Sequence, residues 1–392
     1  MNRETDFDIV VVGAGLVGAA FALAMSGSGL RIALVEGTPP PVLPQDDRWD
    51  SRIYAVSPGN INFLARLGVW DNMDSTRLTP IHEMQVWGDD GRARLDFDTF
   101  EAGAETLGYI VESRQMQTAL WRALESRNDV ELCCPAACAA LELDEQICTL
   151  HLTDGHTLRA RLVVGADGGN SWVRRQAGIE VKGWAYHQQG VVANFTTEKA
   201  HGNIARQWFR PDGILAWLPL PGKRISMVWS TFEPQAQALL ALDELALCEQ
   251  VAQAGGHALG ALQLMTPAAG FPLRLQRASS MVKPRLALIG DAAHLVHPLS
   301  GQGVNLGFRD AACLADVLLQ RGVRADVGDY QLLRRYERAR RSDVLAMQAV
   351  TDSLQKLFNN DQPWLAALRN LGLELTDRQG WLKRRLMAQA MI

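Results

Sequence analysis

Residues 286–305 have the sequence LALIGDAAHLVHPLSGQGVN, which predicts a strand, a loop and the start of a helix. Its first four residues are apolar and precede Gly290, which predicts a short buried strand. Asp291 then lies just past the carboxyl end of the strand, where open α/β sheets place their ligands. One proline and two glycines follow: Pro298, Gly301 and Gly303. They predict a loop whose backbone can approach a flat ligand. From Val304 apolar residues recur at helical spacing, so a helix is expected to begin there.

The chemistry of this stretch suits a flavin. The first N–H groups of a helix are unpaired and carry partial positive charge. A reduced flavin carries negative charge at one edge of its ring, so a helix start aimed there would stabilise that state. Asp291 can accept hydrogen bonds from ribityl hydroxyls. The alternative is an ordinary strand, loop and helix, but the acid at the strand end and the loop glycines favour a flavin site.

The N-terminal segment has the pattern of a dinucleotide-binding βαβ unit. Residues 7–12 predict a buried parallel strand, and the sequence GAGLVG follows at 13–18. A helix is expected next, and then a second strand at 31–35 that ends in Glu36. Glu36 can bind both hydroxyls of an adenosine ribose, which favours FAD or NAD over NADP at this site.

The glycine turn has a task for each residue. Gly13 makes the tight turn, Gly15 admits the pyrophosphate, and Gly18 lets the helix and the strand pack closely. Leu16 and Val17 complete the predicted cofactor-binding turn. No second complete motif of this kind occurs in the sequence. A nicotinamide dinucleotide is therefore expected to dock transiently, without a domain of its own.

The sequence GDAAH at 290–294, with the proline and the GQGVN run after it, resembles the second flavin motif of the class A flavoprotein monooxygenases. These are single-component aromatic hydroxylases with a p-hydroxybenzoate hydroxylase-like fold. The resemblance implies cofactor contacts for the matching residues: Gly290, Asp291, Pro298, Gly301, Gly303, Val304 and Asn305. His294 and the following His297 flank this loop, and a structural histidine is the favoured interpretation. The resemblance names no catalytic side chain.

Residues 50–57 (DSRIYAVS) resemble the family's acid-x-Arg-x-x-Ala-x-Ser element, which covers one flank of the cofactor. Arg52 is therefore a candidate for binding the FAD pyrophosphate or the incoming nicotinamide dinucleotide. The alternative is a surface ion pair with Asp50.

Residues 111–114 (VESR) resemble the family's Glu-Asn-Arg element, from which Ser113 is a departure. Arg114 stays in register with the FAD-contacting arginine of the family. Its alternative is an ion pair with Glu112 at the helix end.

Two more elements extend the resemblance. Residues 165–171 (GADGGNS) match the family's Asp-Gly motif, which is tied to FAD and to the nicotinamide nucleotide through Asp167 and Gly168. Ser171 can cap the next helix. Residues 336–343 (YERARRSD) resemble an element of the ubiquinone-biosynthesis hydroxylases (the UbiH/UbiF/VisC-like group). Taken alone, the last element predicts a solvated, salt-bridged helix face.

The chain is predicted to be an α/β protein with a Rossmann-like FAD-binding domain, an inserted mixed β-sheet substrate domain and a C-terminal helical segment. The expected FAD-binding parts are residues 1–75, 101–177 and 276–328. The expected substrate parts are an excursion at 76–100, which carries a hairpin, and residues 178–275. Helices are expected from 329 to 392. The substrate part has four strand candidates, at 191–197, 204–209, 213–219 and 224–230. Their aromatic residues, Trp208, Phe209, Trp217 and Trp229, fit either a wall for a phenolic ligand or plain core.

Composition narrows the class of protein. The 392 residues allow two to three domain-sized units, and the net charge of -4 argues against nucleic-acid binding. The six cysteines show no metal-binding spacing, so no metal site is predicted. Residues 9–30 carry no charge, but five glycines argue against a transmembrane helix. The expected location is the cytoplasm. Peripheral contact with the inner face of the membrane, through a basic amphipathic helix at 381–390, is left open.

The resemblance implies an FAD-dependent monooxygenase that hydroxylates a polyprenylated phenol in ubiquinone biosynthesis. NAD(P)H would reduce the bound FAD, O2 would add at flavin C4a, and the resulting hydroperoxide would hydroxylate the ring. The expected partners are the hydrophobic phenol and O2, while a biosynthetic complex and an oligomer are left open. Three alternatives remain: a hydroxylase of a small soluble aromatic, an isoprenoid flavin reductase, and a non-catalytic FAD-binding subunit.

Overall fold

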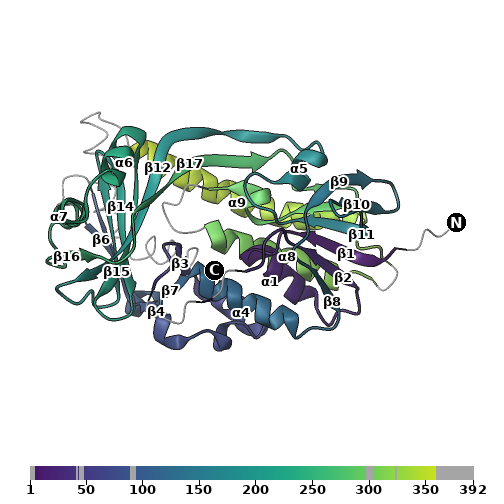
Figure 1. Ribbon diagram of the computed structural model, residues 1–392, viewed down its shortest axis with the longest axis horizontal. Helices are drawn as coiled ribbons and strands as arrows, with labels where there is room; N and C mark the ends of the chain where they lie inside the picture. The colour runs from purple at the N-terminus through teal and green to yellow at the C-terminus, as the bar shows by residue number, and fades with distance from the viewer. Residues whose placement is uncertain are drawn as a thin grey trace.

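The computed structural model describes residues 5–40, 43, 48–88, 94–296, 303–322 and 325–358, with side chains to residue 348. Two halves lie side by side, and two long strands run between them along one edge (Figure 1). The described helices longer than one turn are α1 (Leu16–Met25), α2 (Pro58–Arg66), α4 (Ser113–Glu125), α5 (Trp172–Gln176), α6 (Glu233–Leu240), α7 (Glu244–Ala254), α8 (Gly303–Leu319) and α9 (Tyr330–Phe358). The shorter ones are η1 (Trp70–Asn72), η2 (Ser75–Arg77), α3 (Thr99–Ala102) and η3 (Gly290–Ala292).

Eight of the described strands form the sheet of the first half. They are β1 (Phe7–Val12), β2 (Ile32–Val35), β8 (Val130–Cys133), β9 (Cys138–Leu143), β10 (Cys148–Leu152), β11 (Thr157–Gly165), β18 (Val282–Lys283) and β19 (Leu286–Leu288). The strands β8-β2-β1-β11-β19 are parallel in that order, so their carboxyl ends share one edge. The glycine turn, the Asp-Gly motif and the second flavin motif follow β1, β11 and β19, and they therefore meet at this edge.

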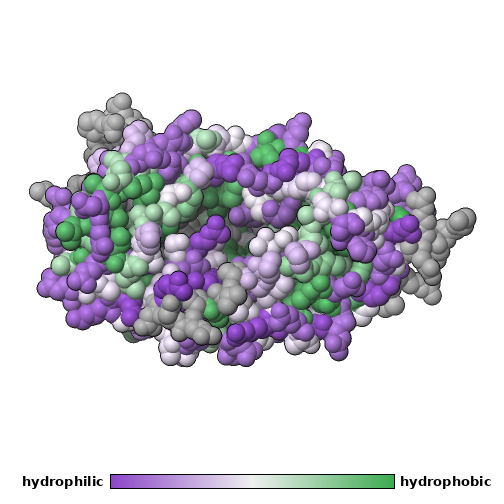
Figure 2. All heavy atoms as spheres, viewed as in Figure 1, coloured by the Kyte–Doolittle hydropathy of each residue, from purple (hydrophilic) through white to green (hydrophobic). Residues whose placement is uncertain are grey.

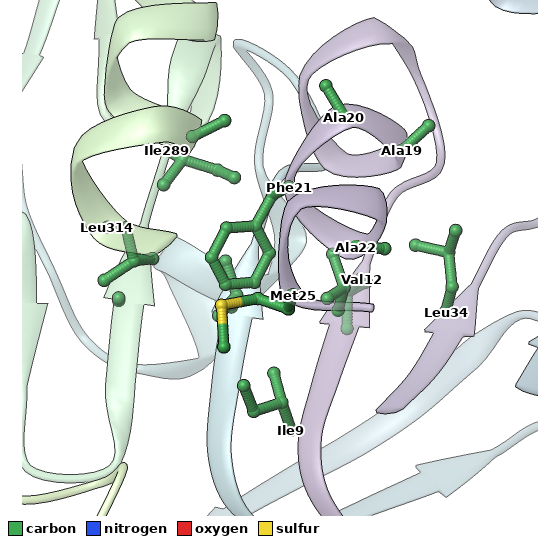
Figure 3. Close-up of a cluster of buried hydrophobic side chains, with 14 of the residues drawn as sticks. Ile9, Val12, Ala19, Ala20, Phe21, Ala22, Met25, Leu34, Ile289 and Leu314 are labelled. Carbon is green, nitrogen blue, oxygen red and sulfur yellow. The ribbon is translucent and has the colours of Figure 1, made fainter. Parts of the chain in front are cut away.

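Helices α1 and α8 pack against each other beside this sheet, and α9 packs on α8. Phe21 and Met25 of α1 lie in a cluster with Ile9 of β1, Ile289 and Leu314 (Figure 3). These side chains are fully buried, and each contributes about 1.5–3 kcal/mol through burial. Apolar packing therefore joins the N-terminal βαβ unit to the second flavin motif, although almost three hundred residues separate them in the chain.

Nine of the described strands form the sheet of the second half. They are β5 (Glu83–Trp87), β6 (Arg94–Asp98), β12 (Val181–Thr197), β13 (Ile204–Arg210), β14 (Gly213–Leu220), β15 (Arg224–Phe232), β16 (Leu262–Leu264), β17 (Ala269–Ala278) and β20 (His294–Leu295). The predicted hairpin is present as β5 and β6, and β5 joins β13 in parallel. All four strand candidates are confirmed. The domain limits given above remain predictions.

Strand β12 begins ten residues before the predicted start at Val191. Its first part pairs with β17, and the register shifts between Ala185 and Gln188. Gly183 lies in this part, where a Cβ atom would come within 2.0 Å of the Leu275 carbonyl oxygen. A glycine normally weakens a strand, so local pattern reasoning missed a segment whose extended form depends on its pairing.

One face of this sheet is the core of the second half. Trp217 and Trp229 are 1% exposed and pack with Phe195 and with residues of α7. Phe209 is buried in a smaller cluster, and Trp208 stacks on Trp87 with ring centroids 4.9 Å apart. For the three buried aromatics the plain-core interpretation is confirmed.

A third, small sheet contacts the nine-stranded sheet on the side of the first half. It contains β3 (Ile53–Val56), β4 (Thr79–Ile81) and β7 (Gly108–Glu112), in the order β3-β7-β4. Ile110 of β7 packs with Ala205 and Leu220 of the nine-stranded sheet. Strand β3 contains residues 53–56 of the DSRIYAVS element, so this contact places the element next to the second half.

Candidate functional site

The glycine turn after β1 has the geometry that the sequence predicts. Gly13 has a φ of +99°, and a Cβ atom there would lie 2.5 Å from the Ala166 carbonyl oxygen. At Gly18 a Cβ atom would lie 1.9 Å from the Gly13 carbonyl oxygen. Both positions therefore exclude any side chain. At Gly15 no described atom lies within 4 Å of such a Cβ, so the backbone is open where a pyrophosphate is expected.

The start of α1 offers its N–H groups to an anion. Gly15 is the N-cap residue, and neither a capping side chain nor an acidic residue occupies the described first turn. Unpaired N–H groups and the helix dipole make such a position favourable for a phosphate group. Leu16 and Val17 open this helix, and the Val17 side chain packs against Gly290 and Gly307. The turn and the second flavin motif are thus in direct contact.

Glu36 lies beside the glycine turn. Its carboxylate accepts hydrogen bonds from Ala14 N at 2.7 Å and from Thr38 N at 3.1 Å. Trp121 of α4 donates from Nε1 to the Ala14 carbonyl oxygen at 3.0 Å. These bonds fix the carboxylate next to the turn, and each of its oxygens keeps a lone pair for a ribose hydroxyl.

Asp167 follows β11 and faces the same edge of the sheet. One carboxylate oxygen accepts from Trp172 N at 2.7 Å and from Val173 N at 3.0 Å, so the side chain caps α5. The other oxygen is buried and has no hydrogen-bond partner among the described residues. Gly168 has a φ of +80°. Ser171 accepts from Arg174 N at 2.9 Å, which confirms the predicted cap.

Asp291 follows β19 at the carboxyl edge of the eight-stranded sheet. Its side chain is accessible to solvent, yet burial by the surrounding protein raises the pKa of its carboxyl group. The charge of His294 works in the lowering direction, and that of Asp310 adds to the rise. Burial and the charge of Asp291 also raise the pKa of the Tyr54 hydroxyl, because Tyr54 of β3 lies near the second flavin motif. A carboxylate that is both enclosed and accessible suits a ligand with hydroxyl groups.

Asn305 makes structural hydrogen bonds that the sequence did not predict. Its side chain is 0% exposed; Oδ1 accepts from Ser57 N at 3.0 Å and from Asn60 Nδ2 at 2.9 Å. Its Nδ2 donates to the Ala55 carbonyl oxygen at 2.8 Å. The side chain therefore ties the first turn of α8 to β3 and α2. Gly303 begins α8, and Val304 is buried in its first turn. Cofactor contacts of these three residues remain a prediction.

The two arginine candidates share one acidic neighbour. Asp50 accepts from Arg52 N at 3.0 Å and from Arg114 N at 3.1 Å. The Arg52 side chain is exposed. The Arg114 guanidinium lies 3.5 Å from Glu112, so the alternative ion pair is present, and it also donates to the Arg48 carbonyl oxygen. Contacts of both guanidinium groups with a dinucleotide remain predictions.

Sequence reasoning missed two residues that support the second flavin motif. Asp310 of α8 accepts a hydrogen bond from Gly290 N, and Arg340 of α9 binds Asp310. His294 also contacts Asp310 and is buried, which confirms the structural interpretation of this histidine. An acid within the apolar run of α8 was the available signal. The solvated-face interpretation of residues 336–343 is wrong for Tyr336, Glu337 and Arg340, which are all buried.

Pro298 and Gly301 of the predicted site lie outside the described residues. The other predicted positions follow the carboxyl ends of β1, β2, β11 and β19 or lie beside β3 and at the starts of α4 and α8. Figure 2 shows a hollow near the middle of this face of the molecule. The open backbone at Gly15 and the carboxylates of Glu36 and Asp291 fit an extended ligand with phosphate and hydroxyl groups. FAD has this chemistry.

Comparisons with known proteins agree with this geometry. Residues 6–353 match the family model described as "FAD binding domain". The chain is 38% identical to 3-demethoxyubiquinol 3-hydroxylase of Escherichia coli, over all of this chain and 99% of that protein. It is 34% identical to human ubiquinone biosynthesis monooxygenase COQ6, over 99% of this chain and 93% of the relative.

Solved structures support the fold. The crystal structure of PqsL from Pseudomonas aeruginosa, a probable FAD-dependent monooxygenase, superposes with a TM-score of 0.79 at 23% identity. The match covers 94% of this chain and all of that one. p-Nitrophenol 4-monooxygenase PnpA from Pseudomonas putida gives a TM-score of 0.78 at 19% identity, over 99% of both chains. The protein therefore belongs to the FAD-binding domain family, in its ubiquinone-biosynthesis hydroxylase group, and FAD is its cofactor.

Proposed function

We propose that the protein is an FAD-dependent aromatic hydroxylase that uses NAD(P)H and O2 to hydroxylate a polyprenylated phenol in ubiquinone biosynthesis. The meeting of three separate motifs at one sheet edge carries this proposal. It is supported by the full-length similarity to two named ubiquinone-biosynthesis enzymes. Bound FAD would supply the redox chemistry and the activation of O2, while the protein provides binding, orientation and shielding from water.

The described residues have separate tasks in this proposal. The N–H groups at the start of α1 would hold the pyrophosphate, and Glu36 the adenosine ribose. Asp291 would accept hydrogen bonds from the ribityl chain, and Asp167, which caps α5, would hold the Asp-Gly turn beside the cofactor. The start of α8 would place positive partial charge beside the ring. Arg52, exposed next to this site, is proposed to meet the nicotinamide dinucleotide.

The phenol would bind between the cofactor and the nine-stranded sheet. Val192, Val228 and Ala216 are paired across β12, β15 and β14. Their neighbours in each strand point into the core, so these three point to the opposite face. Ala205 lies on that same face and packs against the small sheet that contains β3. The same face also carries Asn194 and Ser226, so it combines apolar residues with a few polar ones. Such a surface supports a hydrophobic phenol as substrate.

Membrane contact, a biosynthetic complex and an oligomer are proposals that follow from the substrate. No described helix is long and apolar enough to cross a membrane. The basic segment predicted to contact the membrane lies outside the described residues. A polyprenyl chain partitions into a bilayer, so peripheral association would bring enzyme and substrate together. Flotation with anionic vesicles tests this association, and recovery of all protein in the dense fraction would contradict it.

The function is tested by reducing the FAD-loaded protein with NADH or NADPH under anaerobic conditions, with and without a short-chain prenylphenol. Oxygen is then admitted and the product analysed. Reduction accelerated by the phenol, followed by one added oxygen atom, is the expected result. Fast reduction without any phenol effect and without an oxygenated product would favour the reductase alternative and overturn the proposal.

A further inference from the structure

A buried carboxylate lies directly behind the second flavin motif. Asp310 of α8 is 0% exposed and accepts hydrogen bonds from three sides. The donors are Gly290 N at 3.0 Å, His294 Nε2 at 2.6 Å and Arg340 Nε at 2.7 Å. Gly290 and His294 bracket Asp291, so both ends of the turn that carries Asp291 are bound to one carboxylate.

The third donor comes from α9, and the same face of this helix binds the strand that leads into the turn. Tyr336 donates from its hydroxyl to the Leu288 carbonyl oxygen at 2.9 Å. Glu337 accepts from Met281 N at 2.9 Å. Tyr336, Glu337 and Arg340 are all buried. Residues separated by four positions share a helix face, so α9 contacts the strand and the turn together.

Asp310 lies within ion-pair distance of both His294 and Arg340. Burial opposes ionisation of Asp310, but the charges and hydrogen bonds of His294 and Arg340 outweigh it and lower the pKa of the carboxyl group. Arg340 also donates to Asp343 at 2.7 Å. Removing one partner would leave a buried charge uncompensated, and the turn would then lose its anchor.

We propose that Asp310 and Arg340 are positioning residues for the flavin turn, which act on FAD through Asp291. They hold the backbone of Gly290 and the His294 ring, so that the Asp291 carboxylate stays accessible to the ribityl chain. Helix α9 thereby contributes to FAD retention without touching the cofactor. The inference rests on the proposed contact between Asp291 and FAD.

The test measures FAD affinity of the full chain from the quenching of flavin fluorescence, together with the melting temperature of the apoprotein. Asp310→Asn and Arg340→Met are each expected to raise the Kd by about tenfold, ~1.4 kcal/mol. Arg341→Met is the matched control, because Arg341 is exposed on the same helix, and its Kd should stay within about twofold. His294→Gln keeps an N–H donor and should bind FAD more tightly than His294→Ala.

A double-mutant cycle separates positioning from general stabilisation. Arg340→Met is combined with Asp291→Ala, which removes the hydrogen-bond acceptor through which the network is proposed to act. Positioning predicts that Arg340→Met has little further effect in this background, whereas an independent structural role predicts additive losses. Additive losses, or an unchanged Kd in the single variants, would overturn the inference. If Arg340→Met does not fold, Arg340→Lys enters the same cycle. No phenol, NAD(P)H or O2 is present, so failure of the proposed hydroxylation would not affect this result.

Discussion

Replacing Asn305 by alanine distinguishes the task found in the structure from the one predicted by sequence. The substitution removes the hydrogen bonds to Ser57 N, Asn60 Nδ2 and the Ala55 carbonyl oxygen. Two of these groups belong to the backbone and lie where α8 meets β3. A buried polar group that loses its partner costs about 1–3 kcal/mol, so the two backbone groups together cost about 2–6 kcal/mol.

The assay is urea unfolding of the apoprotein, followed by tryptophan fluorescence, with FAD affinity measured separately. Asn305→Ala should lower the free energy of unfolding by the amount above, with the larger effect on stability rather than on Kd. Asn128→Ala is the matched control, because Asn128 is exposed, and should change stability by less than about 0.5 kcal/mol. Unchanged apoprotein stability together with a Kd raised more than about tenfold would refute the reasoning. Asn305 would then contact the cofactor, as its motif implies.

Three other predictions concern the cofactor edge of the sheet. Gly15→Ala should leave the unfolding of the apoprotein unchanged but weaken FAD binding, because the new Cβ atom enters space that is free of described protein atoms. Gly18→Ala should destabilise the apoprotein itself, because the new Cβ atom meets the Gly13 carbonyl oxygen. Equal effects of the two variants on urea unfolding would contradict this. Glu36→Gln should weaken FAD binding about tenfold but leave FMN binding unchanged, since FMN has no adenosine ribose; equal losses in titrations with both flavins would be inconsistent with a ribose contact. Burial raises the pKa of Asp291 above its ordinary 3.8, so ionisation costs more in the folded apoprotein than in the unfolded chain. The contribution of Asp291 to stability is therefore largest below pH 3.8 and is lost as the pH rises through the raised pKa. Asp291→Asn should remove this pH dependence and be the more stable apoprotein at pH 7. Identical pH profiles of urea unfolding for the two proteins would contradict this prediction.

Much of the fold could be predicted because its signals are local. The apolar run before Gly13 and the run before Gly290 each become buried parallel strands, since such runs cannot remain in water. Gly13 and Gly18 identify the turn because no side chain fits there. The same reasoning failed for the first part of β12, whose extended form depends on pairing with β17.

The candidate site also combines features of short segments with features that depend on the folded chain. The residue pattern alone predicts that a glycine turn, an Asp-Gly motif and an Asp291 loop each follow a strand, because backbone conformation and residue type are properties of short segments. That these three ends share one edge is seen only in the folded chain, since strand order depends on packing between segments far apart in the sequence. The folded chain also shows that Asn305 ties helix to strand and that Asp310 binds Arg340. A polar side chain has the same appearance in a sequence whether its partner is a ligand, a neighbouring helix or water, and its partner is fixed only when the chain has folded around it.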